Sequence, residues 1–261
     1  MLHLSIIGIG TGNPRHVTAE AVAAMNDADL ILIPLKGEDK ADLAGLRHAI
    51  CRTAVTNPAT RIVEIDLPVR DPSIPDYLSR VTAWHDAIAA RWRATITAHL
   101  PQGATAGVAL LVWGDPSLYD STLRIAARLH AHLPLTVKVI PGITAIQALC
   151  AAHAIPLNDL GAPVLLTTAR QLRDHGWPAG IGSAIVMLDS GGAFSTLEAS
   201  AFDIWWGAYV GMREEILIAG PLAEVAPRIL RQRAEARAAH GWIMDIYLLR
   251  YRGITDHPAP A

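Results

Sequence analysis

Residues 2–18, LHLSIIGIGTGNPRHVT, decide the fold class of the chain. An apolar segment of strand length leads into glycines at every second position from Gly8 to Gly12. Pro14 follows, and Thr18 is suited to cap a helix over the alanine-rich segment after it. A buried strand, a glycine-rich turn and a helix together predict the first unit of an α/β protein with a mostly parallel sheet.

A dinucleotide-binding turn would resemble this segment but would need a third glycine and a later acid. The third glycine position holds Asn13, and the next apolar stretch, 30–34, leads to Lys36 instead of Asp or Glu. A dehydrogenase or another nucleotide-binding module is therefore a disfavoured alternative. This alternative would require the protein to bind NAD(H) or ATP.

Strand-like and helical patterns alternate through the first 155 residues, as expected for a sheet with helices on both faces. Strands are expected at residues 2–8, 30–34, 61–67, 106–113 and 135–142, and helices near residues 19–28, 40–54, 75–100, 121–133 and 144–153.

The pattern changes after residues 154–163, AIPLNDLGAP, which we interpret as a linker because prolines and a glycine interrupt them. Apolar segments then lie closer together, at residues 164–168, 184–188, 204–211, 215–220 and 242–251. We therefore expect two domains: an α/β domain at 1–156 and a mixed or antiparallel α+β domain at 163–261.

Composition limits the possible functions. The 261 residues carry a net charge of −2, with 51% hydrophobic residues and a mean hydropathy of +0.28. This balance disfavours a nucleic-acid-binding protein, and no apolar stretch is long enough to span a bilayer. No export signal is evident, so a cytoplasmic location is expected. The two cysteines lack the spacing of a zinc site and are interpreted as buried thiols, and we expect no metal. Four arginines between Arg228 and Arg237 are interpreted as the solvated face of an amphipathic helix.

Glycine-rich turns also follow two later strands: 113–122, WGDPSLYDST, and 141–145, PGITA. Together with the first turn, with 186–189, VMLD, and with 209–211, YVG, they resemble the signature segments of the tetrapyrrole (corrin/porphyrin) methylases. This resemblance covers the whole chain. It implies a two-domain fold that binds S-adenosyl-L-methionine in a cleft between the domains, releases S-adenosyl-L-homocysteine, and commonly forms homodimers.

The resemblance also implies which residues contact the cofactor. They are Thr11, Trp113, Gly114, Asp115, Leu118, Thr144, Ala145, Met187 and Tyr209. Trp113 stands where other members commonly have a glycine or another small residue, so a backbone contact is expected there. Two of these residues have structural alternatives: Asp115 can simply form the Asp-Pro turn, and Met187 can simply be a buried strand residue.

A tetrapyrrole substrate carries many carboxylates and requires local cations. Candidates for binding them are Arg15, His16, Lys36, Lys40, Arg47 and Arg124, each of which could instead be a solvated surface charge. Further segments, among them 36–51 and 234–250, resemble family members that methylate precorrin-5 at C1 and release acetate to give precorrin-6A.

Release of acetate would benefit from a general base or an oxyanion donor. His16, Asp115 and Tyr119 lie in suitable loops for these roles. A family member acting on another precorrin, on RNA or on a protein remains the alternative.

Overall fold

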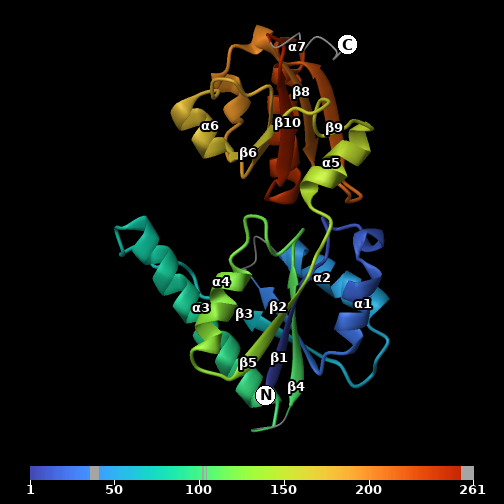
Figure 1. The fold of residues 1–261 in the computed structure, drawn as a ribbon, viewed down its shortest axis with the longest axis vertical. Coiled ribbons are helices and arrows are strands. Elements are labelled where there is room, and N and C mark those ends of the chain that lie inside the picture. Colours follow the sequence, from blue (N-terminus) through green and yellow to red (C-terminus); the bar gives the residue numbers. More distant parts are fainter. Residues whose placement is uncertain (36–40, 102, 104, 254–261) are drawn as a thin grey trace. The chain divides into compact units, whose positions relative to one another are not determined.

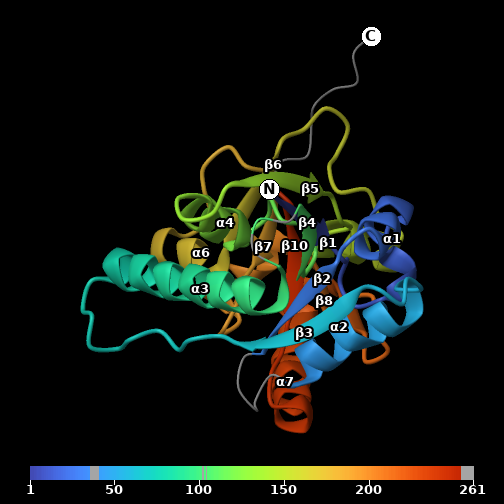
Figure 2. The ribbon, with the colours of Figure 1, turned by 90° about the horizontal axis from the view of Figure 1, so that it is seen from below.

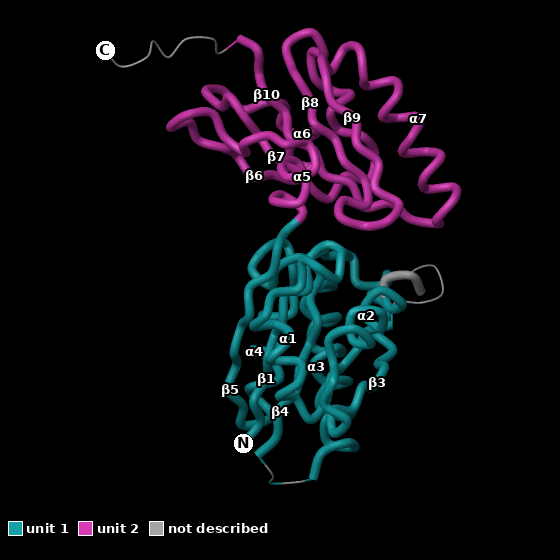
Figure 3. The backbone as a smooth tube through the Cα atoms, turned by 90° about the vertical axis from the view of Figure 1, so that its right-hand side faces the viewer, with its two compact units in different colours: residues 1–144 teal, residues 145–261 magenta. Residues whose placement is uncertain are grey.

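The computed structural model describes residues 1–35, 41–101, 103 and 105–253, without the side chains of residues 41–43. The chain divides into two compact units, residues 1–144 and 145–261, which Figure 3 shows in two colours. The sequence pattern assigns the helix at 145–153 to the first domain, whereas in the structure it belongs to the second unit. Its residues Ala148 and Leu149 pack with Ile185 and Leu248 of the second sheet.

The first unit contains a parallel five-stranded sheet in the order β3-β2-β4-β1-β5. Its strands are β1 (Leu2–Gly8), β2 (Leu30–Leu35), β3 (Arg61–Asp66), β4 (Ala106–Val112) and β5 (Leu135–Ile140). Its helices are η1 (Pro14–His16), α1 (Ala19–Asn26), α2 (Ala41–Ala54), α3 (Tyr77–His99) and α4 (Thr122–His130). The Thr18 hydroxyl caps α1 by accepting a hydrogen bond from the Ala21 amide at 3.1 Å, as expected from the sequence.

Alternate residues of the buried strands face opposite helix layers, because side chains alternate across a sheet. Leu32 and Leu110 pack in the core beneath α3 and α4, whereas Ile33 and Leu111 pack beneath α1 and α2. Figure 2 shows these two helix pairs on opposite sides of the sheet. Because all five strands are parallel, their carboxyl ends meet at one edge of the sheet, and the three glycine-rich turns lie at this edge.

The second unit contains a mixed sheet in the order β6-β7-β10-β8-β9, in which β6 and β7 are parallel and the other neighbouring strands are antiparallel. Figure 1 labels β6, β8, β9 and β10 of this sheet. Its strands are β6 (Val164–Thr168), β7 (Ser183–Met187), β8 (Phe202–Ala208), β9 (Ile216–Pro221) and β10 (Asp245–Tyr251). Its helices are α5 (Ala145–His153), α6 (Ala169–His175), η3 (Ala193–Thr196), η4 (Ala199–Ala201) and α7 (Leu222–His240). The mostly parallel first sheet and the mixed second sheet confirm the expected fold class.

Arg233 corrects the expectation that the arginines of α7 form a solvated face. Its side chain is buried, and its Nε donates to Asp245 Oδ2 at 2.7 Å. A second guanidinium nitrogen donates to the backbone oxygen of Asp189. The helical pattern alone cannot reveal this, because the paired acid comes from a strand that follows α7 in the chain.

Candidate active site

The turns that follow β1, β4 and β5 contact one another through bare backbone. A Cβ atom on Gly8 would lie 2.6 Å from the Gly142 nitrogen and 2.8 Å from the Gly114 oxygen. A Cβ atom on Gly142 would overlap that same Gly114 oxygen. At Gly8 and Gly142, glycine therefore allows the turns to approach each other.

Hydrogen bonds fix the first turn to the second. The Gly114 amide donates to the Gly10 oxygen at 2.8 Å, and the Gly10 amide donates to the Gly114 oxygen at 3.3 Å. Both residues have positive φ angles, 74° and 66°, which glycine adopts without steric cost. The two turns therefore form one rigid backbone platform.

Asp115 fixes the second turn to the third. Its Oδ2 accepts from the Gly142 amide at 2.8 Å, and its Oδ1 accepts from the Ser117 amide at 2.8 Å. Partial burial raises the pKa of Asp115, but the hydrogen bonds from Ser117 and Gly142 outweigh this effect and the net pKa is lowered. A carboxylate with a lowered pKa and occupied oxygens favours the turn-forming role over that of a general base.

Two buried polar atoms of the first turn have no hydrogen-bond partner in the part of the chain that the structure describes. Thr11 is 4% exposed, and its hydroxyl makes no hydrogen bond within the described residues. The same holds for Nδ1 of His16, whose Nε2 lies 3.4 Å from Asn13 Nδ2. An unsatisfied buried polar group costs about 1–3 kcal/mol. A ligand that supplies the missing partners would recover that free energy.

The side chains of the second turn differ in their exposure. Trp113 is half-buried and packs with the core beneath α1 and α2, which leaves its backbone for a cofactor contact. Leu118 is half-buried, and Tyr119 is 45% exposed with a left-handed φ of 49°. Left-handed tyrosine is uncommon and is a form of strain that concentrates at functional sites. Thr144 and Ala145 follow the third turn, and Ala145 is the first residue of α5.

The candidate substrate-binding cations of the first unit occupy different environments. Arg15 is exposed on η1, beside the half-buried His16. Arg124 is exposed on α4, and its Nη1 donates to the Asp120 backbone oxygen at 2.8 Å. Arg47 extends from α2, and its Nε donates to the Leu111 oxygen at 3.1 Å. Lys36 and Lys40 lie outside the described residues.

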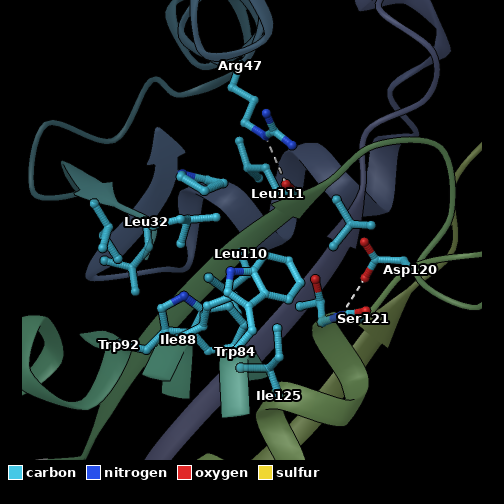
Figure 4. Close-up of a pocket in the computed structure, with 15 residues that line it drawn as sticks. Leu32, Arg47, Trp84, Ile88, Trp92, Leu110, Leu111, Asp120, Ser121 and Ile125 are labelled. Carbon is cyan, nitrogen blue, oxygen red and sulfur yellow. Dashed lines mark hydrogen bonds between the residues drawn. The ribbon is translucent and has the colours of Figure 1, made fainter. Parts of the chain in front are cut away.

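Arg47 also lines a cavity, which no pattern in the sequence indicates. Burial lowers the pKa of Arg47 to about 10, an effect opposed by the charge of Asp120. The guanidinium carbon lies 6.0 Å from the centre of the Trp113 ring. Figure 4 shows the Arg47 side chain directed from its helix toward Leu111 and the cavity. This environment differs from that of a solvated surface charge.

In the second unit, the candidate cofactor residues end β7 and β8. Met187 is the last residue of β7 and is half-buried. The Tyr209 ring is buried, and its hydroxyl donates to the Trp242 oxygen at 2.6 Å. The Tyr209 amide donates a hydrogen bond to the Met244 oxygen, and the Tyr209 carbonyl accepts one from the Met212 amide. Because these groups already have partners, Tyr209 fits a structural role better than a cofactor contact.

The turn after β7 contains a buried polar network that sequence reasoning missed. Asp189 accepts hydrogen bonds from the amides of Gly191, Gly192 and Ala193 and from the Tyr247 hydroxyl, at 2.7–2.8 Å. Asp189 ends the segment 186–189, VMLD, two residues after β7, but this segment does not reveal the partners of its carboxylate. This network fixes the backbone that follows Met187.

Comparisons with known proteins assign the family. The model of the family described as tetrapyrrole (corrin/porphyrin) methylases matches residues 3–226. The chain belongs to this family. Within the part of this methylase that the structure describes, no group of three or more His, Cys, Asp or Glu residues could hold a metal ion. No described helix is long and apolar enough to cross a membrane.

Individual relatives and solved structures agree with this assignment. The methylase is 48% identical to a precorrin-6A synthase [deacetylating] of Sinorhizobium sp, over 96% of its own length and 95% of the relative's. A cobalamin synthesis related protein (CobF) from Corynebacterium diphtheriae is 37% identical, with a TM-score of 0.82 over 96% of this chain and 98% of that one. A uroporphyrin-III C-methyl transferase from Thermus thermophilus, complexed with S-adenyl homocysteine, shares the fold at 16% identity, with a TM-score of 0.54 over 95% and 97% of the two chains.

Proposed function

We propose that this methylase transfers a methyl group from S-adenosyl-L-methionine to C1 of precorrin-5 and releases acetate, giving precorrin-6A. The observation that carries the proposal is the 48% identity to a precorrin-6A synthase [deacetylating] over nearly the full length of both chains. The likeness to CobF, which is described as a cobalamin synthesis related protein, supports a role in cobalamin synthesis.

The turns of the first unit offer suitable groups for the cofactor. The buried Thr11 hydroxyl has no hydrogen-bond partner among the described residues, and Gly114 has open space at its Cα, since a Cβ would meet only Thr144 Cα, at 3.8 Å. Further proposed contacts are Trp113 through its backbone, Asp115, Leu118, Thr144, Ala145 and, in the second unit, Met187 and less favourably Tyr209. When bound, S-adenosyl-L-methionine supplies an activated methyl group, so the protein's main contribution is positioning, which can lower a barrier by about 7–11 kcal/mol.

We assign the tetrapyrrole carboxylates to Arg15, His16, Arg47 and Arg124, together with Lys36 and Lys40. Arginine holds a carboxylate through two parallel hydrogen bonds, which fix the orientation of the ring as well as its position. The exposed Arg15 and Arg124 lie on helices that begin just after the first and second turns.

Deacetylation requires water to add to the acetyl carbonyl, after which the bond from that carbon to the ring breaks. The acetyl carbon leaves as acetate, and the ring carbon keeps the bonding electron pair. Of the three candidates His16, Asp115 and Tyr119, we favour His16 for moving the water proton, because its Nδ1 has no partner in the described part of the chain. We assign Tyr119, whose side chain is exposed, as the donor to a developing oxyanion, whereas the carboxylate of Asp115 already accepts a hydrogen bond from the Gly142 amide.

The proposal is tested by incubating the purified protein with methyl-labelled S-adenosyl-L-methionine and precorrin-5. The expected products are a labelled macrocycle and one equivalent of acetate. Methylation without acetate would remove the deacetylation step, and no methylation would overturn the assignment.

A second candidate substrate is another precorrin. A precorrin-2 C(20)-methyltransferase of Sinorhizobium sp is 33% identical over 58% of this chain. Offering precorrin-2 in place of precorrin-5 distinguishes the two substrates. We also propose a homodimer and a cytoplasmic location; sedimentation equilibrium of the purified protein tests the first, and cell fractionation tests the second.

A further inference from the structure

Strands β2 and β4 separate before they end. Their pairing stops at Leu32 and Leu110, although β2 continues along β3 to Leu35 and β4 continues along β1 to Val112. A continued parallel ladder would direct the Leu111 carbonyl to the amide of residue 34. Residue 34 is proline, which has no amide hydrogen, so the ladder cannot continue there.

Arg47 takes the place of the missing donor. Its Nε donates to the Leu111 oxygen at 3.1 Å. The helix that follows β2 lies on one face of the sheet and the helix that follows β4 lies on the other. The separation of β2 and β4 thus lies at a topological switch point of the sheet, a position where α/β proteins preferentially bind ligands.

A cavity of about 90 Å³ lies at this separation. Pro34 and Val112 line it from the two strands, and the apolar side chains of Ile88 and Ile125 line it from α3 and α4 (Figure 4). Trp84 also lines the cavity, but its indole Nε1 already donates a hydrogen bond to the Pro68 oxygen, at 2.6 Å. A cavity of about 150 Å³ holds benzene, so by proportion this one holds about four non-hydrogen atoms.

Two charged side chains, Arg47 and Asp120, line the cavity. Arg47 brings a guanidinium into a largely apolar space, and burial lowers its pKa to about 10, so it remains charged at neutral pH. Asp120 also lines the cavity, and its Oδ1 accepts from the Thr122 amide at 2.6 Å. The charge of Asp120 already stabilises the charged guanidinium. A small anion bound to the guanidinium would add to this stabilisation.

We propose that the cavity between the carboxyl ends of β2 and β4 binds an acetate-sized carboxylate, with its oxygens on Arg47 and its methyl or methylene carbon against the isoleucines of α3 and α4. Acetate has four non-hydrogen atoms, and the planar guanidinium matches a carboxylate. The proposal rests on the proposed function for the source of the ligand. That source is either the acetate released by the reaction or an acetate side chain of the macrocycle.

The cavity also adjoins the proposed reaction site within the first unit. Asp120, Ser121 and Thr122 line the cavity and belong to the same turn as Gly114 and Asp115. The proposed binding site for a two-carbon group therefore lies at one end of the second turn, and the residues proposed to contact the cofactor lie at its other end.

The first test is calorimetric titration of the full-length protein with sodium acetate and with sodium butyrate. The wild type is expected to bind acetate saturably with a millimolar or lower Kd, and butyrate, with six non-hydrogen atoms, about tenfold more weakly. Arg47→Met should weaken acetate binding by at least about tenfold, as expected for loss of a buried charged partner. Arg52→Met is the matched control, since Arg52 is exposed near the end of the same helix. Ile125→Phe fills the cavity without changing Arg47 and should also abolish binding, so the test does not depend on one variant folding.

Absence of saturable acetate binding by the wild type overturns the proposal, as does binding that Arg47→Met and Ile125→Phe leave unchanged. Inhibition of turnover then identifies the source. Competitive inhibition by acetate against the tetrapyrrole, with a raised KM in Arg47→Met, supports a macrocycle side chain. Noncompetitive inhibition with a lowered kcat supports released acetate. If acetate binds as expected but precorrin-5 is not methylated, the proposed function fails and the carboxylate site stands.

Discussion

The contact between the three glycine-rich turns predicts that Gly142→Ala is strongly destabilising. An added Cβ would overlap the Gly114 oxygen and lie 2.8 Å from the Gly8 Cα. Both neighbours are backbone atoms held by the sheet and by the hydrogen bonds between Gly10 and Gly114, so they cannot yield as the end of a side chain would. Gly142 does not have a positive φ, so steric overlap alone determines the cost.

We expect this overlap to cost about 3 kcal/mol, at the upper end of the usual range for overpacking. With a urea m-value of about 2 kcal/mol/M, the unfolding midpoint should fall by about 1.5 M. Because the chain has two units, native-state hydrogen exchange of β1 should accompany circular dichroism, so that the measurement reports on the first unit.

Gly45→Ala is the matched control. Gly45 lies in α2, has no atom within 4 Å of an added Cβ and has no positive φ. Alanine should therefore stabilise the helix by about 0.5–1 kcal/mol. An unchanged midpoint in Gly142→Ala, measured beside this control, would refute the close contact of the turns.

Three other substitutions test the site and its support. Thr11→Val should preserve stability, because the hydroxyl has no partner in the described residues, but weaken S-adenosyl-L-homocysteine binding about tenfold by calorimetry; equal affinity would exclude a contact from this hydroxyl. Asp115 has a lowered pKa in the folded state, so its stabilisation is present above its unfolded pKa and is lost as pH falls through the folded pKa. Asp115→Asn should therefore reduce stability at pH 7 by about 1 kcal/mol and flatten the acid limb of the stability profile; an unchanged limb would contradict this. Arg233→Met should cost about 3–5 kcal/mol in urea unfolding because Asp245 remains buried without its partner, and adding Asp245→Asn should restore part of that loss; additive losses would argue against the pairing.

The fold could be predicted from local patterns because each element carries its own signal. Strand alternation and the Thr18 cap are properties of short segments, and the structure confirms them. The role of Gly8 and Gly142 is different, since the atoms that exclude a side chain at Gly142 include an oxygen that is 28 residues away in sequence. A one-dimensional pattern shows that glycine is present but not which atom requires it.

The site was predictable only in part for the same reason. The motifs identify the turns, yet the unpartnered Thr11 and His16 atoms and the environment of Arg47 depend on tertiary packing. Arg233 is a further example: the sequence pattern assigns it to the solvated face of an arginine-rich helix, but its side chain is buried. Charged side chains are assigned to solvent by default, and only their partners can correct that assignment.

Pro34 has a consequence for how the first sheet could change. Because a single absent N–H group ends the ladder between β2 and β4, exchanging the proline for valine would return a donor to the Leu111 carbonyl. That donor would compete with the guanidinium of Arg47 and draw the two strands together. The presence of this opening would then depend on one backbone atom, so a relative could lose or gain the compartment through a single codon.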